Sequence, residues 1–213
     1  MHMTDRARIG VVSDTHGPLP QEVFDLFNGQ WSTEDLRART TERYRILLDG
    51  NGAPALEKMA SDDPSPIDTF ACDLILHAGD IGVQSVLDEL GAIARTIAVL
   101  GNNDRTPYWC SDGDVRPFRS LAFCGVNIAL QHIPADLARS LHGRPPLIEP
   151  SVPALPHLAV HGHTHVPRIE LDDGCVLLCP GSPVQARRGS GHHVALVDLE
   201  GGRLSTVSFI DLD

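Results

Sequence analysis

The sequence predicts an α/β fold in which mixed β-sheets are covered by helices on their outer faces. Short apolar runs recur along the 213-residue chain and indicate buried strands, because they are apolar on both faces. Helical segments fall between several of these runs. After residue 166 the apolar runs are instead separated by tight turns, which is typical of antiparallel hairpins. Parallel and antiparallel strands are therefore both expected.

Five apolar runs in the first three quarters of the chain are each followed at once by polar residues. They are Arg8–Ser13, Asp73–His77, Arg95–Leu100, Val126–Gln131 and His157–Val160. Helices are expected over Leu19–Phe27 and Val83–Leu90. The antiparallel part should contain four strands, Val166–Leu171, Cys175–Cys179, Val194–Leu199 and Leu204–Ile210.

The composition, with 42% hydrophobic and 21% charged residues, is that of a globular protein. A net charge of −11 argues against a protein that coats long nucleic acids, although bound cations could still attract a small phosphate substrate. No apolar run approaches the ~20 residues of a membrane-spanning helix, and no secretory leader is recognised. Five cysteines without a paired framework fit the cytoplasm. We expect a single domain over residues 1–213, and a homo-oligomer stays open.

Two segments interrupt the pattern of strands. Residues 28–68 are expected to form an inserted helical segment, with a helix over Leu36–Leu48 that starts at the capping-box spacing of Ser32 and Asp35. A second short helix is expected after Pro54. The arginines of the segment would then occupy a solvated helix face; they are Arg37, Arg39, Arg43 and Arg45. The segment could form a cap or a dimer contact. Residues 134–156 are rich in proline and should be mostly loop around one helical turn near Ala135–Leu141.

Metal-ligand side chains follow the five strands at the point where each strand ends. Because ligands bind beyond the carboxyl ends of strands in such sheets, these side chains could converge on one rim. They are Asp14, His16, Asp80, Asn102, His132, His163 and His165. Taken singly, Asp80 next to Gly79, or Asn102 next to Gly101, would be an ordinary turn residue. Turns do not require Asp-x-His after one strand and His-x-His after another, so the set predicts two metals that share a carboxylate.

The motifs around these residues resemble the signature of calcineurin-like metallophosphoesterases, in particular the small bacterial and archaeal phosphodiesterase branch. The matching segments are Ser13-Asp14-Thr15-His16-Gly17, His77-Ala78-Gly79-Asp80, Leu100-Gly101-Asn102-Asn103-Asp104, His132, Gly162-His163-Thr164-His165 and Pro180-Gly181-Ser182. The resemblance implies a four-layer αββα sandwich of two mixed β-sheets flanked by helices.

The resemblance also implies roles for the residues. Asp14, His16 and His165 would bind the first metal, and Asn102, His132 and His163 the second. Asp80 would bridge both, and a hydroxide shared by the metals would attack a small phosphodiester in line. Manganese is the expected metal, with Fe, Co, Ni and Zn open. The alternatives are a phosphomonoesterase, a nuclease, or a non-catalytic metal-binding scaffold of the same fold.

Three positions depart from the family pattern. Asn103 stands where many members carry a histidine that can protonate the leaving group, and we place it with Asp80 and His132 in the catalytic group. Cys179 precedes Pro-Gly-Ser, where asparagine is frequent. Ile133 follows His132, where glycine is usual. The first departure bears on the choice of substrate, the other two on loop shape.

Several polar residues near these motifs have two interpretations. His77 could orient a ligand or be a satisfied core histidine. For His161 a core or rim position is favoured, and for His192 and His193 an exposed one. Arg187 or Arg188 could contact a substrate phosphate or lie in a solvated loop.

Overall fold

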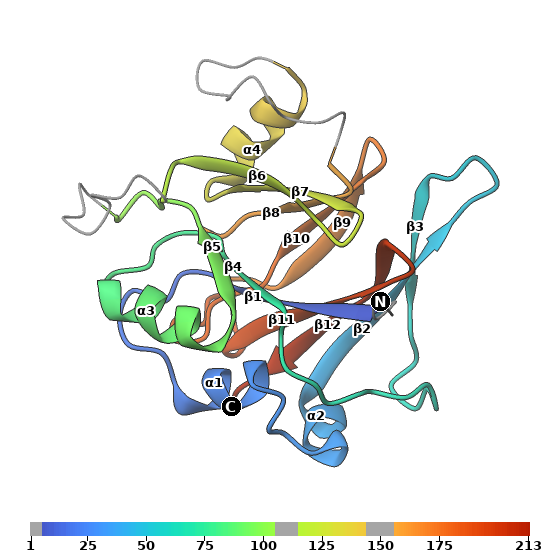
Figure 1. Cartoon of the computed structure of the whole chain (residues 1–213), viewed down its shortest axis with the longest axis horizontal. Helices are drawn as coiled ribbons and strands as arrows, with labels where there is room; N and C mark the ends of the chain where they lie inside the picture. Colours follow the sequence, from blue (N-terminus) through green and yellow to red (C-terminus); the bar gives the residue numbers. More distant parts are fainter. Residues whose placement is uncertain (1–5, 105–114, 144–155) are drawn as a thin grey trace, which may run out of the picture.

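The computed structural model describes residues 6–104, 115–143 and 156–213. Two mixed β-sheets pack face to face, and helices cover the outer face of each sheet (Figure 1). The predicted four-layer sandwich is therefore confirmed. Each boundary between layers is filled by its own apolar cluster, because helices and sheets must each bury an apolar face. Leu76, Val160 and Val176 lie between the sheets.

The larger sheet has seven strands in the order β3-β2-β12-β11-β1-β4-β5. Its strands are β1 (Arg6–Val12), β2 (Thr40–Leu48), β3 (Pro54–Lys58), β4 (Leu74–His77), β5 (Arg95–Ala98), β11 (His193–Glu200) and β12 (Arg203–Asp211). β1, β4 and β5 are parallel, and the other neighbours are antiparallel. Leu74 and Leu76 face the second sheet whereas Ile75 faces the helices, which explains why β4 is apolar at every position.

The smaller sheet has five strands in the order β6-β7-β8-β10-β9. Its strands are β6 (Phe118–Phe123), β7 (Val126–Gln131), β8 (Leu158–Val160), β9 (Arg168–Asp172) and β10 (Cys175–Cys179). β7, β8 and β10 are parallel, and the hairpin partners β6 and β9 form the two edges. β6 was not predicted from the sequence, because Arg119 and Ser120 interrupt its apolar residues, of which only Phe118 is buried.

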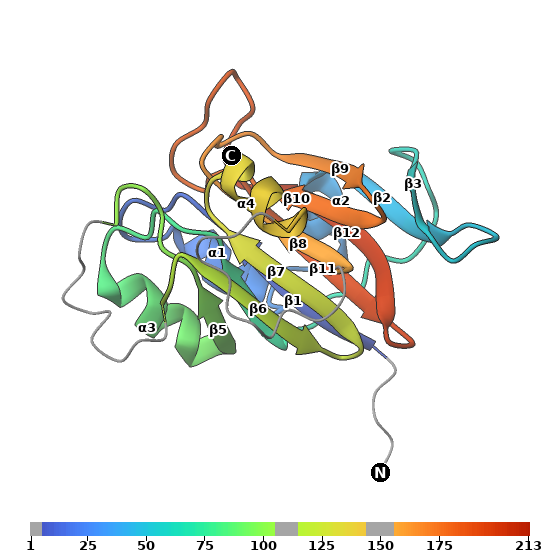
Figure 2. The ribbon, with the colours of Figure 1, turned by 90° about the horizontal axis from the view of Figure 1, so that it is seen from above.

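Three helices lie on the larger sheet: α1 (Gln21–Phe27), α2 (Thr33–Arg39) and α3 (Gln84–Ile93). Their buried residues, such as Phe27 and Leu90, pack on Ile75 of the sheet. On the smaller sheet lies α4 (Pro134–Leu141), as the view from above shows (Figure 2). It buries Leu137 against Ala129 and Ala159. In the described ranges, no helix has the length and apolar character needed to cross a membrane.

The prediction of an inserted helical segment over residues 28–68 was wrong in its main element. A helix does begin after Ser32, whose hydroxyl accepts the amide of Asp35 at 3.0 Å, but it ends at Arg39. Thr40 to Leu48 then form a strand that pairs with β12, and Pro54 to Lys58 form β3 instead of a second helix. The segment therefore supplies two of the seven strands of the larger sheet. Arg43 and Arg45 lie on a strand, not on a solvated helix face.

Two further expectations meet the structure in this part of the fold. The helical turn predicted near Ala135–Leu141 is α4, while residues 144–155 of the proline-rich segment lie outside the described ranges. His193 was expected to be exposed, but it is only 3% exposed because it begins β11 between β1 and β12. His192 remains partly exposed and contacts Asp213.

Candidate metal centre

The carboxyl ends of five strands, β1, β4, β5, β7 and β8, meet at one edge of the two sheets. The loops that follow them are joined by backbone hydrogen bonds: the Asp14 amide donates to the Gly79 carbonyl at 2.9 Å, and the Gly162 amide to the His132 carbonyl at 3.0 Å. Each of these bonds joins neighbouring strands of one sheet, and the bond from the His132 ring to the Ala78 carbonyl links the two sheets, so all seven candidate ligands lie in one constellation. The convergence expected from the sequence is therefore present.

One group of donor atoms forms around Asp14. Its Oδ1 lies 3.2 Å from Nε2 of His165, and Nε2 of His16 lies 3.5 Å from the same His165 nitrogen. Asp14 and His165 are almost fully buried, whereas the His16 side chain is 20% exposed. The group therefore has a fixed inner side and an open outer side.

A second group forms around Asn102. Its Oδ1 lies 3.1 Å from Nε2 of His132 and 2.9 Å from Nδ1 of His163. His132 is 2% exposed and comes from the end of β7, while Asn102 is exposed on the loop after β5. This group, too, has a buried anchor and a solvent-facing side.

Asp80 lies between the two groups. Its Oδ2 is 3.8 Å from His16 Nε2 and 3.4 Å from His132 Nε2. Ligands that share a metal at about 2.1 Å lie roughly 3–3.5 Å from one another, so the spacing within each group fits a bound divalent ion. Oxygen and imidazole nitrogen donors suit Mn, Fe, Co, Ni and Zn alike. The residues present therefore fit two metals with Asp80 between them.

Two histidines present their Nε2 lone pairs to this site because their other ring nitrogen is occupied. His165 donates from Nδ1 to the Gln185 carbonyl, and His132 donates from Nδ1 to the Ala78 carbonyl, both at 2.8 Å. Such a bond fixes the tautomer and the orientation of the ring. Nε2 of each ring is then free to accept a metal.

Five of the seven candidate ligands have a left-handed backbone conformation. Their φ angles are 55° for Asp14, 49° for His16, 55° for Asp80, 69° for His163 and 58° for His165. Residues other than glycine avoid this region at a cost of roughly 1 kcal/mol or more each, and such strain concentrates at functional sites. The loops thus turn sharply enough to aim consecutive donors at one point.

The family model described as calcineurin-like phosphoesterase superfamily domain matches residues 62–202 of the 213. The chain belongs to this superfamily. No curated protein matches it.

Solved structures of the superfamily fold cover nearly the whole chain at low identity. An archaeal phosphodiesterase is 19% identical over 94% of this chain and 99% of that chain, with a TM-score of 0.58. The zinc complex of Vps29 from Entamoeba histolytica is 17% identical over 97% and 93%, also at 0.58. A predicted phosphoesterase from Streptococcus pneumoniae TIGR4 is 16% identical over 97% and 90%, at 0.53. At such identities the likeness concerns the fold.

The ionisable residues of the candidate centre differ in their electrostatics. Burial alone would raise the pKa of Asp80, but the His132 ring and the Asn103 donors outweigh burial and hold this pKa below its usual range. Burial likewise would lower the pKa of His132, and the neighbouring carboxylates raise it instead. Burial raises the pKa of Asp14, against the hydrogen bond from Ser13. Cations bound among these groups would offset the free-energy cost of burying both ionised carboxylates.

Asn103 is exposed to solvent and also contacts Asp80. Its side-chain amide donates to Oδ2 of Asp80 at 2.6 Å, and its backbone amide donates to Oδ1 at 2.8 Å. The sequence alone indicated a role for this residue only in place of a proton donor. In the structure it also holds the carboxylate between the two groups.

Two positioning residues were missed as such in the sequence. The Asp104 carboxylate accepts backbone amides from Ile81, Gly82 and Gly101, at 2.8–3.2 Å, and so ties the loop after β4 to the loop after β5. The Ser182 hydroxyl donates to the Asp14 carbonyl at 2.8 Å. Both residues lie in segments that the family motifs contain, and this was the available signal.

Two glycines are required by close approach. A Cβ at Gly101 would collide with the Asp80 carboxylate, and one at Gly162 would collide with the Ser13 hydroxyl and the Asp14 carboxylate. These positions allow the loops to pass directly behind the ligands.

His77 and His161 differ from the ligands in their contacts. The His77 ring is fully buried, accepts the Gly79 amide at Nδ1 and meets the Thr15 hydroxyl at Nε2, 3.0 Å away. Burial lowers the pKa of His77 to about 3. It is a satisfied core histidine that supports the Asp14–His16 loop. His161 is 5% exposed, and its Nδ1 donates to the Gly162 carbonyl at 3.0 Å, consistent with the favoured rim position.

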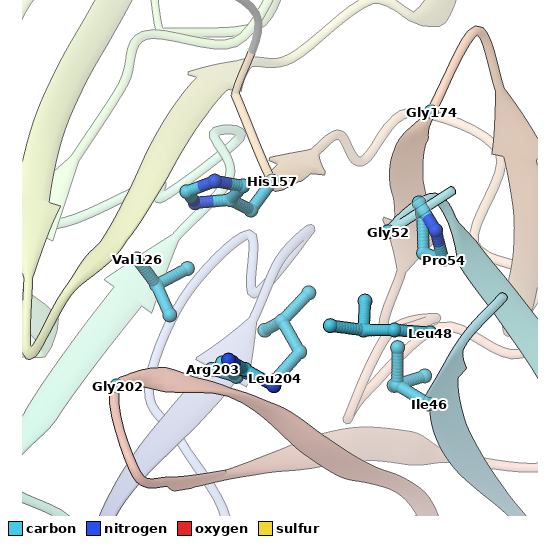
Figure 3. A pocket seen from close by; sticks show the side chains of 10 residues that line it. All are labelled: Ile46, Leu48, Gly52, Pro54, Val126, His157, Gly174, Gly202, Arg203 and Leu204. Carbon is cyan, nitrogen blue, oxygen red and sulfur yellow. The ribbon is translucent and has the colours of Figure 1, made fainter. Parts of the chain in front are cut away.

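A separate pocket of about 210 Å³ lies at the opposite end of the strands, where β7 begins (Figure 3). Ile46, Leu48 and Leu204 project into it, together with His157 from the segment before β8. Four of its lining residues are aliphatic, and none of the groups of metal donors found among the described residues lies in it. The turn between β2 and β3 lies at this pocket, so the turn does not cover the metal-binding edge.

Proposed function

We propose that the protein is a dinuclear metal-dependent phosphodiesterase that hydrolyses small phosphodiesters. The observation that carries this proposal is the arrangement of seven competent donors in two groups, with Asp80 between them. Divalent ions bound there, with manganese as our first choice, would supply Lewis acidity to the phosphoryl oxygens and to the attacking water.

The residues of this chain have distinct tasks in such a reaction. Asp14, His132 and His165 are buried anchors, which keep the centre rigid. His16, His163 and Asn102 form its open side, where a phosphoryl group can approach. Asn103 holds the Asp80 carboxylate through two hydrogen bonds.

The leaving group should depart largely without a proton from the protein. An amide such as Asn103 has no acid form near neutral pH. His77 cannot take over this task, since both of its ring nitrogens are engaged and its pKa is low. Esters with acidic leaving groups, such as aryl esters, are the substrates that need this help least. This favours diesters of good leaving groups as test substrates.

The proposed compartment is the cytoplasm. The described cysteines, Cys72, Cys124, Cys175 and Cys179, are all free thiols. A reducing environment is where unpaired cysteines are ordinarily found.

The test is hydrolysis of bis(4-nitrophenyl) phosphate by metal-free protein, before and after addition of manganese. Metal content is measured in the same samples. We expect turnover that requires the metal and rises with occupancy of two ions per chain. A protein that holds two ions and shows no turnover above the metal-free blank would instead be a metal-binding scaffold. A strong preference for 4-nitrophenyl phosphate would indicate a monoesterase.

A further inference from the structure

A hollow of about 380 Å³ opens beside the metal-binding edge, at His163. Its walls come from α4 (Pro134), from the segment that follows β8 (His161 and Val166), from β9, and from the loop between β10 and β11. A volume of this size is typical of small-molecule sites. A group bound at the metals would therefore lie at the mouth of this hollow.

Three arginines line the hollow: Arg168 on β9, and Arg187 and Arg188 on the loop after β10. Glu170, the one carboxylate among the described residues of its wall, already pairs with Arg168 at 2.6 Å. Arg187 donates to the His163 carbonyl at 3.3 Å, which places its guanidinium directly beside a candidate ligand. Within the described ranges, neither Arg187 nor Arg188 forms an ion pair with a carboxylate.

The charge in this hollow is opposite to that of the whole protein. The chain has a net charge of −11, whereas the described lining of the hollow has three arginines and a single glutamate. The paired N–H groups of a guanidinium match the oxygens of a phosphate. Arg187 and Arg188 together would balance the charge of about −2 on a phosphate monoester. A second hollow of about 320 Å³ shares Pro134, His161 and Glu170 with the first, and adds the apolar side chains of Leu137 and Leu177. Space for an organic group thus adjoins the arginines.

We propose that Arg168, Arg187 and Arg188 bind a second phosphate of the substrate, so that the preferred phosphodiesters carry a further phosphate monoester. This inference rests on the proposed phosphodiesterase activity and names its substrate class. The loop that carries Arg187 and Arg188 is itself fastened to the metal centre, because the Gln185 carbonyl accepts the His165 ring and the Ser190 hydroxyl donates to the His165 carbonyl. The distance between the metal centre and the arginines is therefore fixed, which selects substrates by the spacing of their two phosphates.

The experiment compares two chromogenic esters that differ by one group: thymidine 5′-(4-nitrophenyl phosphate) and the same compound with a 3′-phosphate. In both, water adds to phosphorus, the bond to the aryl oxygen breaks, and 4-nitrophenolate leaves. We expect manganese-loaded protein to show a kcat/KM about tenfold or more higher for the 3′-phosphorylated ester, since a charge-assisted hydrogen bond changes binding by roughly 10- to 100-fold. This preference should decrease as salt is added.

The variant Arg188→Gln removes one of the cations, and Arg95→Gln is the matched control. Arg95 is exposed at the start of β5, so its replacement changes the net charge equally without touching the hollow. Arg188→Gln should reduce the ratio of the two kcat/KM values several-fold, and Arg95→Gln should leave the ratio unchanged. Equal ratios in wild-type protein and both variants would overturn the inference while leaving the proposed activity intact.

Binding provides a second measurement that does not need turnover. Isothermal titration with thymidine 3′,5′-bisphosphate and thymidine 5′-monophosphate should give the bisphosphate the lower Kd, and Arg188→Gln should remove most of that difference. If neither ester is hydrolysed but the bisphosphate still binds more tightly, the proposed activity fails and the phosphate site stands. If the two nucleotides bind equally to wild-type protein, the phosphate site is rejected.

Discussion

The side-chain amide of Asn103 donates a hydrogen bond of 2.6 Å to the carboxylate of Asp80. The residue that replaces an expected proton donor is thus also a support for the carboxylate between the two groups of ligands. Replacement of the Asn103 side chain therefore also removes a hydrogen bond from the Asp80 carboxylate.

Asp80→Asn should reduce metal-dependent hydrolysis by at least ~10²-fold, because the neutral amide removes the charge that both metals would share. The fold should persist, as far-UV circular dichroism and urea unfolding can show. Asp88→Asn, on the exposed face of α3, is the control, because it changes the net charge equally and affects only an exposed hydrogen bond from Gln84. Near wild-type turnover in an Asp80→Asn protein that still holds two metals would show that Asp80 does not bridge them.

Asn103→His should raise activity most for esters with poor leaving groups. General-acid assistance contributes typically ~10²–10⁴-fold, so its absence should produce a steep dependence of rate on the pKa of the leaving group. The dependence is measured on a series of aryl and alkyl diesters, and the histidine should flatten it. Asn103→Ala, which removes the support of Asp80 without adding an acid, should keep the steep slope. A shallow slope in the wild type would contradict this account of Asn103.

His77 should make the metal-free protein less stable in mild acid. Its pKa is about 3 in the folded chain and about 6.5 in the unfolded chain, so below pH 6.5 the unfolded chain binds a proton that the folded ring refuses. The free energy of unfolding therefore falls as the pH decreases from 6.5 towards 3, and His77 should account for roughly 2 kcal/mol of this loss by pH 5.

Urea unfolding between pH 5 and pH 7 tests the role of His77. His77→Gln should reduce the pH dependence by that amount, whatever its effect on the stability at pH 7. His157→Gln, at an exposed histidine, is compared as the control for the loss of an imidazole. Identical slopes in all three proteins would show that His77 takes up its proton in the folded state.

Asp104→Asn should destabilise the protein by about 1–3 kcal/mol, since an amide nitrogen would face backbone donors that the carboxylate now accepts. Hydrolysis should decline as well, because Asp104 joins the loops that carry Asp80 and Asn102. Urea unfolding and turnover are compared with those of Asp88→Asn. Unchanged values for both would mean that the loops keep their positions without this carboxylate.

Replacement of residues 40–58 by a short Gly-Ser link should prevent formation of stable protein. β2 covers one edge of β12, so its loss would expose the backbone of Thr206 to Ile210 to pairing with other chains. Size-exclusion chromatography should show aggregates. Shortening only the turn of residues 49–53 should leave a folded, active protein, because that turn lies away from the metal-binding edge. A well-behaved protein without β2 and β3 would show that the two strands are dispensable.

The parallel core and the site were predictable, whereas the segment after α1 was not. A run such as Leu74-Ile75-Leu76 is apolar on both faces, and only a buried strand explains it. Over Leu36–Leu48, the spacing of apolar residues and arginines is also compatible with the two faces of an amphipathic helix. The β-branched pair Thr40-Thr41 and the alternation of Tyr44 and Ile46 with Arg43 and Arg45 were the competing signals for a strand.

The contacts of Arg43 explain why the arginines of β2 suggested a solvated helix. Arg43 pairs with Ser208 across the sheet, and its guanidinium donates to the carbonyls of Ser65 and Pro66. Burial lowers the pKa of Arg43 accordingly. Only the path of residues 60–70 over the sheet makes such a position acceptable for an arginine. No local pattern contains that path.

Five candidate ligands have a left-handed backbone, so selection for stability alone would not retain aspartate or histidine at these positions. Glycine adopts such angles without a steric penalty, so a change such as His16→Gly would relax the loop while deleting a donor. Stabilised variants obtained by selecting for heat resistance alone should accumulate changes at these very positions. Conversely, a lineage that retains aspartate and histidine there keeps a lower free energy of unfolding, which only the use of the centre explains.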